Sequence, residues 1–282
     1  MKLGTFSNSA NYTEIGIIED KFIIPVKKIN ENIPNDMIML MDGWDKYYQE
    51  IIKNISNINY KIPLTSINLH APIKRPPKIF AIGLNYSDHV LETGSEKPKK
   101  QLWFSKLANT IVGPDDKIKI PIVSEKVDYE VELIVVIGKQ GHHIKIEEVS
   151  NYIFGYCIGN DVSVRDWQMQ TSQWMLGKSF DTHGPTGPYI TTANEIKDPH
   201  QLGIRSFVNG ELRQNSNTRH LIFNIWDQVA YLSTALTLEV GDIIFTGTPG
   251  GVGFSMNPPK FLKDGDVVRC EIDILGKIEN KC

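Results

Sequence analysis

The sequence has few cysteines and no long hydrophobic run. Its thiols, Cys157, Cys270 and Cys282, are too few and too scattered among 282 residues for a disulfide framework or a thiolate metal site. No apolar segment approaches the ~20 residues that cross a bilayer. The first residues also lack the charged start and apolar stretch of a signal peptide. We therefore expect a protein of a reducing compartment, the cytoplasm, without a membrane partner.

An excess of one charge is also absent. The chain carries 30 basic and 33 acidic side chains, for a net charge of −3, and the two signs are interspersed. This balance argues against a nucleic-acid partner. There is no Gly-x-Ser-x-Gly elbow and no His-Glu-x-x-His, which argues against serine hydrolases and zinc proteases. The glycine-rich segment 242–253 is no P-loop, and the prolines after it exclude the helix that a dinucleotide would need.

Short apolar segments separated by turns make up most of the chain. A basic, proline-rich stretch at 70–80 precedes most of them and is typical of an extended linker. Asn209 and Gly210 stand between two such segments and predict a β-hairpin. The strands expected after the linker are 78–83, 117–121, 131–138, 154–161, 187–192, 205–212, 242–247 and 267–273.

Helical patterns are fewer. Residues 42–57 place aromatic and isoleucine side chains at helical spacing, and Asp42 could cap this helix. Further helices are expected at 87–94, 146–154 and 224–236. The predicted fold is mostly β with minor α, a sandwich, roll or barrel. We expect a small N-terminal α+β domain at 1–70 and a larger catalytic domain at 71–282.

Two carboxylates stand out in the apolar segment 127–139. Glu130 and Glu132 are two residues apart, so on a strand they project from the same face. If that face is buried, a cation must separate them or one of them must be protonated. Asp161, at the end of another apolar segment, offers a third carboxylate, and such an oxygen set suits Mg²⁺ or Mn²⁺ better than Zn²⁺. The alternative is that one glutamate faces solvent on an edge strand.

Three further residues offer proton transfer or charge. His89 and Glu92 share a face if their segment is helical, and the carboxylate could then orient the imidazole as a general base. The alternative is an ordinary surface pair. Lys178 lies among small and aromatic residues, where it could stabilise an enolate or simply end a strand in solvent.

Substrate-binding candidates follow the same strands. Arg165 and Gln168 come just after Asp161, and Arg165 could bind a substrate carboxylate or pair with a neighbour such as Asp166. In the glycine-rich segment, the Thr248 hydroxyl and the backbone N–H groups could hold an anion.

Taken in order, these motifs resemble the fumarylacetoacetate hydrolase family from about residue 75 to the C-terminus. They resemble most the branch that holds its domain-containing protein 2 type and the 2-hydroxyhepta-2,4-diene-1,7-dioate isomerase-like proteins. The matching segments are FAIGLNYSDHVLE, WFSKLANTIVGPDD, DYEVELIVVIGK, GYCIGNDVSVRDWQ, GKSFDTHGPTGPYI and GDIIFTGTPGGVG. The resemblance implies a β-roll or β-sandwich core, a homodimer, and bound Mg²⁺, with Mn²⁺ or Ca²⁺ as alternatives.

The resemblance also implies a role for each candidate residue. Glu130, Glu132 and Asp161 would hold the metal. His89, Glu92 and Lys178 would be catalytic. The substrate-contacting residues would be Arg165, Gln168 and Thr248.

The implied substrates are small 2-keto or 2,4-dioxo acids that react through an enolate. Acylpyruvate-type C–C bond hydrolysis is the first expectation. Oxaloacetate tautomerisation or decarboxylation and hydroxyheptadienedioate isomerisation are the alternatives, and a non-catalytic metabolite-binding protein is a remote one.

Overall fold

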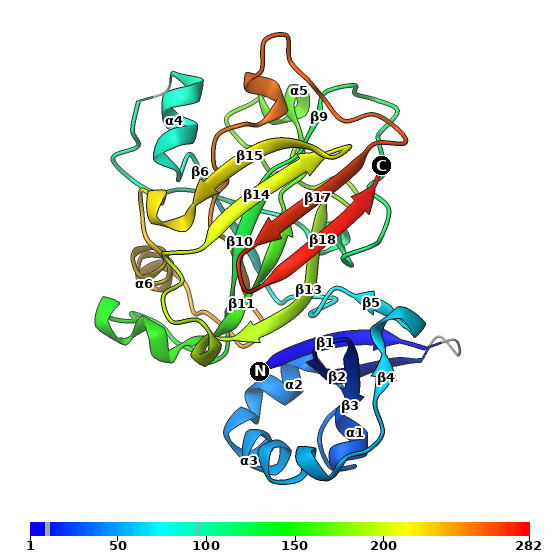
Figure 1. The fold of residues 1–282 in the computed structure, drawn as a ribbon. Coiled ribbons are helices and arrows are strands. Elements are labelled where there is room, and N and C mark those ends of the chain that lie inside the picture. Colours follow the sequence, from blue (N-terminus) through cyan, green and yellow to red (C-terminus); the bar gives the residue numbers. More distant parts are fainter. Residues whose placement is uncertain (9–11, 95) are drawn as a thin grey trace.

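The computed structural model describes residues 1–8, 12–94 and 96–282, and strands dominate it (Figure 1). Before the glycine-rich loop the strands are β1 (Lys2–Ser7), β2 (Thr13–Glu19), β3 (Phe22–Pro25), β4 (Ile62–Pro63), β5 (Asn68–His70), β6 (Ile79–Gly83), β7 (Leu102–Ser105), β8 (Ile111–Val112), β9 (Val127–Asp128), β10 (Val131–Ile137), β11 (Ile153–Asn160), β12 (Ser163–Val164), β13 (Gly184–Thr192), β14 (Gly203–Val208), β15 (Glu211–Asn217) and β16 (Ile243–Phe245). The last two are β17 (Val267–Ile272) and β18 (Gly276–Lys281). The α-helices are α1 (Val26–Ile29), α2 (Met37–Asp42), α3 (Trp44–Asn54), α4 (Ser87–Thr93), α5 (Arg165–Gln168) and α6 (Ile225–Ala235).

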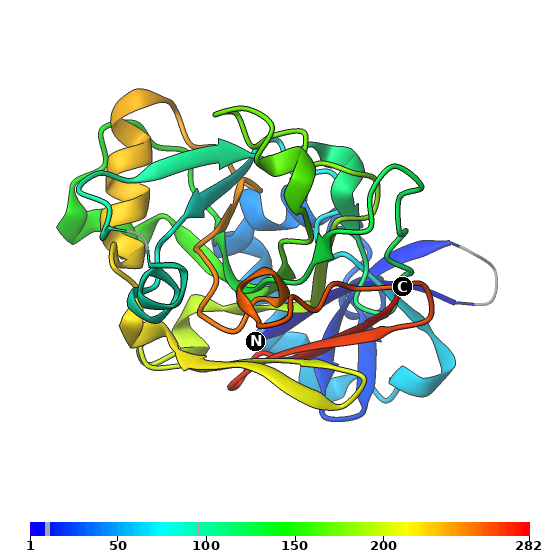
Figure 2. The ribbon, with the colours of Figure 1, turned by 90° about the horizontal axis from the view of Figure 1, so that it is seen from above.

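Two sheets stack to form the body of the molecule. The larger has the order β4-β3-β2-β1-β13-β11-β10-β16-β6-β7, and the smaller has the order β15-β14-β17-β18. The smaller sheet, yellow to red in Figure 2, packs against β10, β11 and β13. Within the described ranges neither sheet closes, because its first and last strands do not pair. The mostly-β prediction is confirmed, as a sandwich rather than a barrel.

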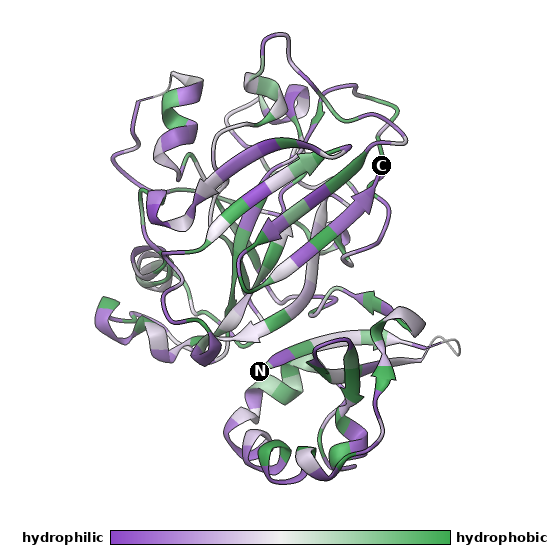
Figure 3. Ribbon diagram, viewed as in Figure 1, coloured by the Kyte–Doolittle hydropathy of each residue, from purple (hydrophilic) through white to green (hydrophobic). Residues whose placement is uncertain are grey.

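Strand β10 is buried on both faces. Val131, Leu133 and Val135 pack into the core between the two sheets, whereas Ile134 and Val136 pack toward the N-terminal elements. A strand covered on both sides reads as a continuous apolar run, which explains its sequence. By contrast, one face of β17 is half-buried and one face of β18 is exposed, and Figure 3 shows hydrophilic and hydrophobic segments alternating along them.

The N-terminal elements extend the larger sheet. β1 pairs antiparallel with β13, and helices α1 to α3 lie below this part of the sheet in Figure 1. The division into 1–70 and 71–282 stays a prediction. No helix in the described part of the chain is both long and apolar enough to span a membrane.

Local sequence signals explain several boundaries. Asn209 and Gly210 have φ of 52° and 80°, the positive values that a tight hairpin turn requires, and they join β14 to β15 as predicted. Asn224 caps α6 in a capping box with Asp227. Gly94 ends α4 in the left-handed conformation.

Three local predictions need correction. Asp42 does not cap α3, because it ends α2 and Gly43 occupies the cap position. The segment expected to be helical at 146–154 forms only a 3₁₀ helix, Ile146–Asn151, before β11 begins. Residues 117–121 form no strand. The Ile118 N–H donates to the Lys281 carbonyl of β18, but the next N–H, that of Lys119, donates to the Thr182 hydroxyl, so no strand ladder continues.

Candidate active site

Strand pairing brings the three predicted carboxylates together. Val131 of β10 is opposite Asn160 of β11, and the Asp161 N–H donates to the Glu130 carbonyl at 2.8 Å. Glu130, Glu132 and Asp161 are at most 5% exposed, and one carboxylate oxygen from each lies within 4.8 Å of the others. Burial on a central strand excludes the alternative of a solvent-facing glutamate on an edge.

Basic side chains neutralise two of these carboxylates. Lys178 Nζ lies 2.7 Å from both Glu130 Oε2 and Asp161 Oδ2. Lys106 Nζ lies 2.6 Å from the other oxygen of Asp161 and also donates to the Lys178 carbonyl. Lys178 is therefore buried within the cluster and is not a solvated strand end. Its pKa is raised because Asp161 and Glu130 outweigh the effect of burial, which acts to lower it.

Glu132 differs from its two neighbours. Its carboxylate accepts a hydrogen bond from the Gly247 N–H at 2.7 Å. Burial, Asp161 and Glu130 together raise the pKa of Glu132 well above its usual value. For Glu130, burial acts to raise the pKa, but Lys178 and Arg165 lower it to about 2. A third buried carboxylate that forms no ion pair with a basic side chain in the described part of the chain fits a site for a divalent cation.

Arg165 begins α5 and contacts the Glu130 oxygen that Lys178 does not. Its Nη1 lies 2.8 Å from Glu130 Oε1 and donates to Gln168 Oε1 at 3.0 Å. Nε and Nη2 contact Asp128 at 2.9 and 2.8 Å. The charged partners of Arg165 are thus Asp128 and Glu130, whereas Asp166 accepts from the Ser124 hydroxyl.

Helix α4 holds His89 and Glu92 at the mouth of the site. His89 Nδ1 lies 3.6 Å from Glu92 Oε2, so the predicted proximity is confirmed. The Gly251 N–H donates to the same Glu92 oxygen at 2.9 Å. The glycine-rich loop therefore does bind anions through its backbone, but these are the protein's own carboxylates, Glu132 and Glu92. The Thr248 hydroxyl donates to the Val131 carbonyl at 2.9 Å.

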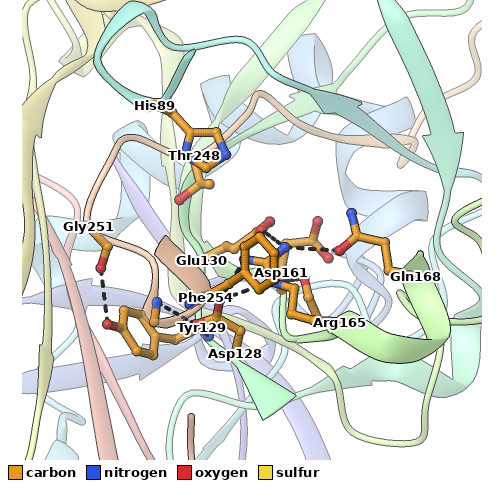
Figure 4. Close-up of polar contacts among 12 residues, drawn as sticks. His89, Asp128, Tyr129, Glu130, Asp161, Arg165, Gln168, Thr248, Gly251 and Phe254 are labelled. Carbon is orange, nitrogen blue, oxygen red and sulfur yellow. Dashed lines mark hydrogen bonds and ion pairs between the residues drawn. The ribbon is translucent and has the colours of Figure 1, made fainter. Parts of the chain in front are cut away.

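A cavity of about 260 Å³ opens among these residues. Figure 4 shows His89 and Thr248 on one side, with Glu130, Asp161, Arg165 and Gln168 gathered opposite. The predicted residues that line it are His89, Glu130, Glu132, Arg165, Gln168, Lys178 and Thr248. Glu92 and Asp161 stand behind them, in contact with His89 and Lys178. Apolar walls complete it, formed by Phe104, Trp174, Phe254 and smaller side chains.

Two charged residues of the site were missed from the sequence. Asp128 precedes Glu130 by two positions, so the same alternation that paired Glu130 with Glu132 could have pointed to it. Lys106 follows the apolar strand β7, and its full burial carried no sequence signal, because a lysine at a strand end is ordinarily solvated.

The fold and cavity define an enzyme class with a mostly-β core and a carboxylate-lined pocket. Residues 78–282 match the family model described as fumarylacetoacetate (FAA) hydrolase C-terminal. This chain therefore belongs to the fumarylacetoacetate hydrolase family of enzymes.

Curated relatives and a solved structure agree with this assignment. A fumarylacetoacetate hydrolase domain-containing protein 2 homolog of Dictyostelium discoideum is 46% identical over 280 residues, 94% of this chain and 91% of that protein. The mitochondrial oxaloacetate tautomerase of Xenopus laevis is 46% identical over 260 residues, 92% of this chain and 82% of that protein. Maleylpyruvate hydrolase of Sphingobium sp. SYK-6, solved with manganese(II) and pyruvate, superposes with a TM-score of 0.84 at 30% identity, covering 100% of this chain and 98% of that one.

Proposed function

We propose that this protein interconverts the enol and keto forms of oxaloacetate, using a divalent cation held by Glu130, Glu132 and Asp161. The observation that carries the proposal is the convergence of three buried carboxylates, Lys178 and His89 at one small cavity. The tautomerase named above supports this choice over the hydrolysis that the sequence motifs placed first. The similarity of this chain to enzymes also supports catalysis over the remote alternative of a metabolite-binding protein.

The cation we propose is Mg²⁺, with Mn²⁺ or Ca²⁺ as substitutes. Carboxylate oxygens are the ligands that these hard ions prefer. When bound, the ion supplies a Lewis acid for the keto and carboxylate oxygens of a 2-keto acid. The manganese complex of the maleylpyruvate hydrolase supports a site of this kind.

Side chains next to the proposed cation ligands would stabilise the negative charge of the enolate and transfer protons. Ketonisation moves one proton from the enol oxygen to C3. Lys178 uses two of its three N–H donors on Glu130 and Asp161, so the third can hold the oxygen that loses its proton. His89, with Nδ1 toward Glu92, would transfer the C3 proton through Nε2. In this proposal Arg165, Gln168 and Thr248 contact the substrate.

Acylpyruvate hydrolysis is the second candidate, and the His89–Glu92 pair favours it. Here His89 would take a proton from a water molecule that attacks the distal carbonyl. The C–C bond then breaks with its electron pair left on the departing pyruvate enolate, while the hydroxyl stays on the acid. Because the same side chains serve both reactions, the two candidates are distinguished by their products.

Parallel assays separate these candidates. Enol-oxaloacetate and acetylpyruvate would each be incubated with purified protein, with Mg²⁺, Mn²⁺ or a chelator, and the products identified by NMR. We expect metal-dependent ketonisation of oxaloacetate and little pyruvate or acetate from acetylpyruvate. Metal-dependent cleavage of acetylpyruvate, with oxaloacetate unchanged, would instead select the hydrolase. If the chelator lowers neither the ketonisation rate nor the cleavage rate, the metal site is contradicted.

We also propose a homodimer. Leu176 is exposed beside a hollow lined by Ile120 and Pro121, and the next two residues, Ile122 and Val123, are exposed as well. Contiguous apolar side chains of this kind are typical of protein interfaces. Light scattering on wild type and a Leu176→Glu variant tests it, since a monomeric wild type contradicts the proposal.

We propose that the protein lies in the cytoplasm, because its three scattered cysteines are typical of a reducing compartment, whereas the Xenopus relative is named mitochondrial. Cell fractionation with a tagged chain distinguishes the two compartments.

A further inference from the structure

Asp128 lies behind the cavity wall, where its carboxylate accepts hydrogen bonds from three backbone N–H groups and from Arg165. Its side chain is fully buried at the end of β9, and it is not among the residues that line the cavity. Oδ1 accepts from the backbone N–H groups of Gly253 at 2.8 Å and Tyr129 at 3.0 Å. Oδ2 accepts from the Phe254 N–H at 2.9 Å and faces Arg165.

Asp128 contacts two separate parts of the site, the Arg165 side chain of α5 and the backbone of Gly253 and Phe254. Arg165 contributes Nε and Nη2 at 2.9 and 2.8 Å, and its other end holds Glu130 and Gln168. Gly253 and Phe254 begin the 3₁₀ turn Gly253–Ser255 at the end of the glycine-rich segment, and the Phe254 ring lies at the cavity rim, 5.9 Å from the Arg165 guanidinium carbon. Figure 4 shows Asp128 below Arg165 and Phe254. One carboxylate thus joins the wall of the cavity to its rim.

The turn approaches Asp128 too closely for a side chain at position 253. A Cβ on Gly253 would lie 2.8 Å from Asp128 Oδ1 and 2.0 Å from the Lys260 carbonyl oxygen. The close approach lets two consecutive N–H groups reach the same carboxylate. Gly253 is therefore needed for the contact itself.

We infer that Asp128 is a positioning residue that couples the Arg165 guanidinium to the turn bearing Phe254, so that the keto acid binds only when both are in place. Asp128 occupies the inner edge of Arg165, which limits that side chain to one contact with Glu130 through Nη1. Without Asp128, the whole guanidinium fork would be free to turn onto Glu130, a carboxylate proposed to hold the cation. The turn would at the same time lose the acceptor for two buried N–H groups. The effect on keto-acid binding rests on the proposed function, whereas the coupling of Arg165 to the turn does not.

The experiment uses Asp128→Asn, Arg165→Gln and their double variant, with Tyr129→Phe as the matched control. Tyr129 is the neighbouring residue and donates its hydroxyl to the Gly251 carbonyl at 3.0 Å, so its variant removes one bond to the same loop without touching Arg165. Two quantities are measured: hydrogen exchange of the peptides containing Gly253 and Phe254, and calorimetric binding of oxalate in the presence of Mn²⁺. Steady-state kinetics with oxaloacetate accompany them.

We expect Asp128→Asn to weaken oxalate binding and raise KM by about tenfold or more, as loss of a buried charged hydrogen bond does, with a smaller change in kcat. Arg165→Gln should speed exchange at the turn, although Arg165 does not contact those amides. In the double variant, oxalate affinity should fall by less than the product of the two single losses, because Asp128 and Arg165 act as one coupled pair. Tyr129→Phe should match wild type in both quantities.

Other results overturn the inference. An unchanged hydrogen-exchange rate at the turn in Arg165→Gln contradicts the coupling. It is also contradicted if the loss of oxalate affinity in the double variant equals the product of the two single losses. A Tyr129→Phe variant as impaired as Asp128→Asn contradicts it as well. If Asp128→Asn does not fold, Gly253→Ala displaces the turn while keeping the carboxylate, and wild-type oxalate affinity in that variant also contradicts it. A wild type that converts neither keto acid, yet shows the coupling, refutes the proposed function and leaves this inference standing.

Discussion

Glu92 accepts a hydrogen bond from the backbone N–H of Gly251 at 2.9 Å, across 159 positions of sequence. This bond fixes the carboxylate of helix α4 against the glycine-rich loop. The orientation of the His89–Glu92 pair therefore depends on a loop that follows β16 as well as on the helix that carries the pair.

Substitution of Glu92 tests whether its charge or its position matters. Glu92→Gln keeps an oxygen for the Gly251 N–H but removes the charge beside His89. If the pair transfers protons, Glu92→Gln and Glu92→Ala should both lower kcat by about 10²-fold or more. If Glu92 only anchors α4, Glu92→Gln should retain near-wild-type kcat while Glu92→Ala loses it, and that result contradicts proton transfer.

Removing one proposed metal ligand should impair cation binding directly. Glu132→Gln and Asp161→Asn should each weaken Mn²⁺ binding by more than about 100-fold, since loss of an outer partner alone costs 10- to 100-fold. Isothermal titration calorimetry measures this. Glu147→Gln, on the exposed face of the 3₁₀ helix before β11, is the control and should bind as wild type does. Wild-type Mn²⁺ affinity in either ligand variant contradicts the site.

Trp174 should limit the length of the substrate. Its ring lies 5.6 Å from the Phe104 ring, and a Cβ on Gly83 would come within 2.4 Å of the indole, so the ring packs directly on the Gly83 backbone. Trp174→Ala should open this end of the cavity and raise the relative kcat/KM for longer acylpyruvates by about tenfold. Trp226→Ala, which removes an indole packed on His200 away from the cavity, is the control. An unchanged preference in Trp174→Ala contradicts the prediction.

His183 should make stability depend on pH. It is fully buried, Nε2 lies 2.9 Å from the Lys119 carbonyl oxygen, and burial lowers its pKa from 6.5 to about 4. Between these values the unfolded chain binds a proton that the folded protein does not, so the free energy of unfolding falls as the pH falls from 6.5 toward 4. The full contribution is about 3 kcal/mol, at 1.36 kcal/mol per pKa unit.

A His183→Gln variant isolates this contribution. Urea unfolding with chelator present would be compared with wild type at several pH values across that window. The variant should lose less stability than wild type as the pH falls, because carboxylates affect both proteins equally. Parallel pH profiles for the two proteins would rule out His183 as the cause.

Short-range patterns in the sequence determined much of this protein. The two-residue spacing of Glu130 and Glu132 placed them on one face, because side chains alternate along any strand. Positive φ at Asn209 and Gly210 followed from the turn that those residue types prefer. The family motifs then gave each candidate residue a role, and those residues line one cavity or contact the residues that do.

Only the tertiary structure decided which charges meet. Asp128 faces Arg165 because β9 pairs with β12, and that register has no local signal. Lys106 reaches Asp161 across 55 positions, buried where a lysine is rarely found. The backbone N–H groups of Gly247 and Gly251 donate to Glu132 and Glu92, contacts between residues far apart in the sequence that no local pattern predicts. Long-range pairing depends on the packing of the whole sheet, whereas turn type and strand alternation depend on a few neighbouring residues.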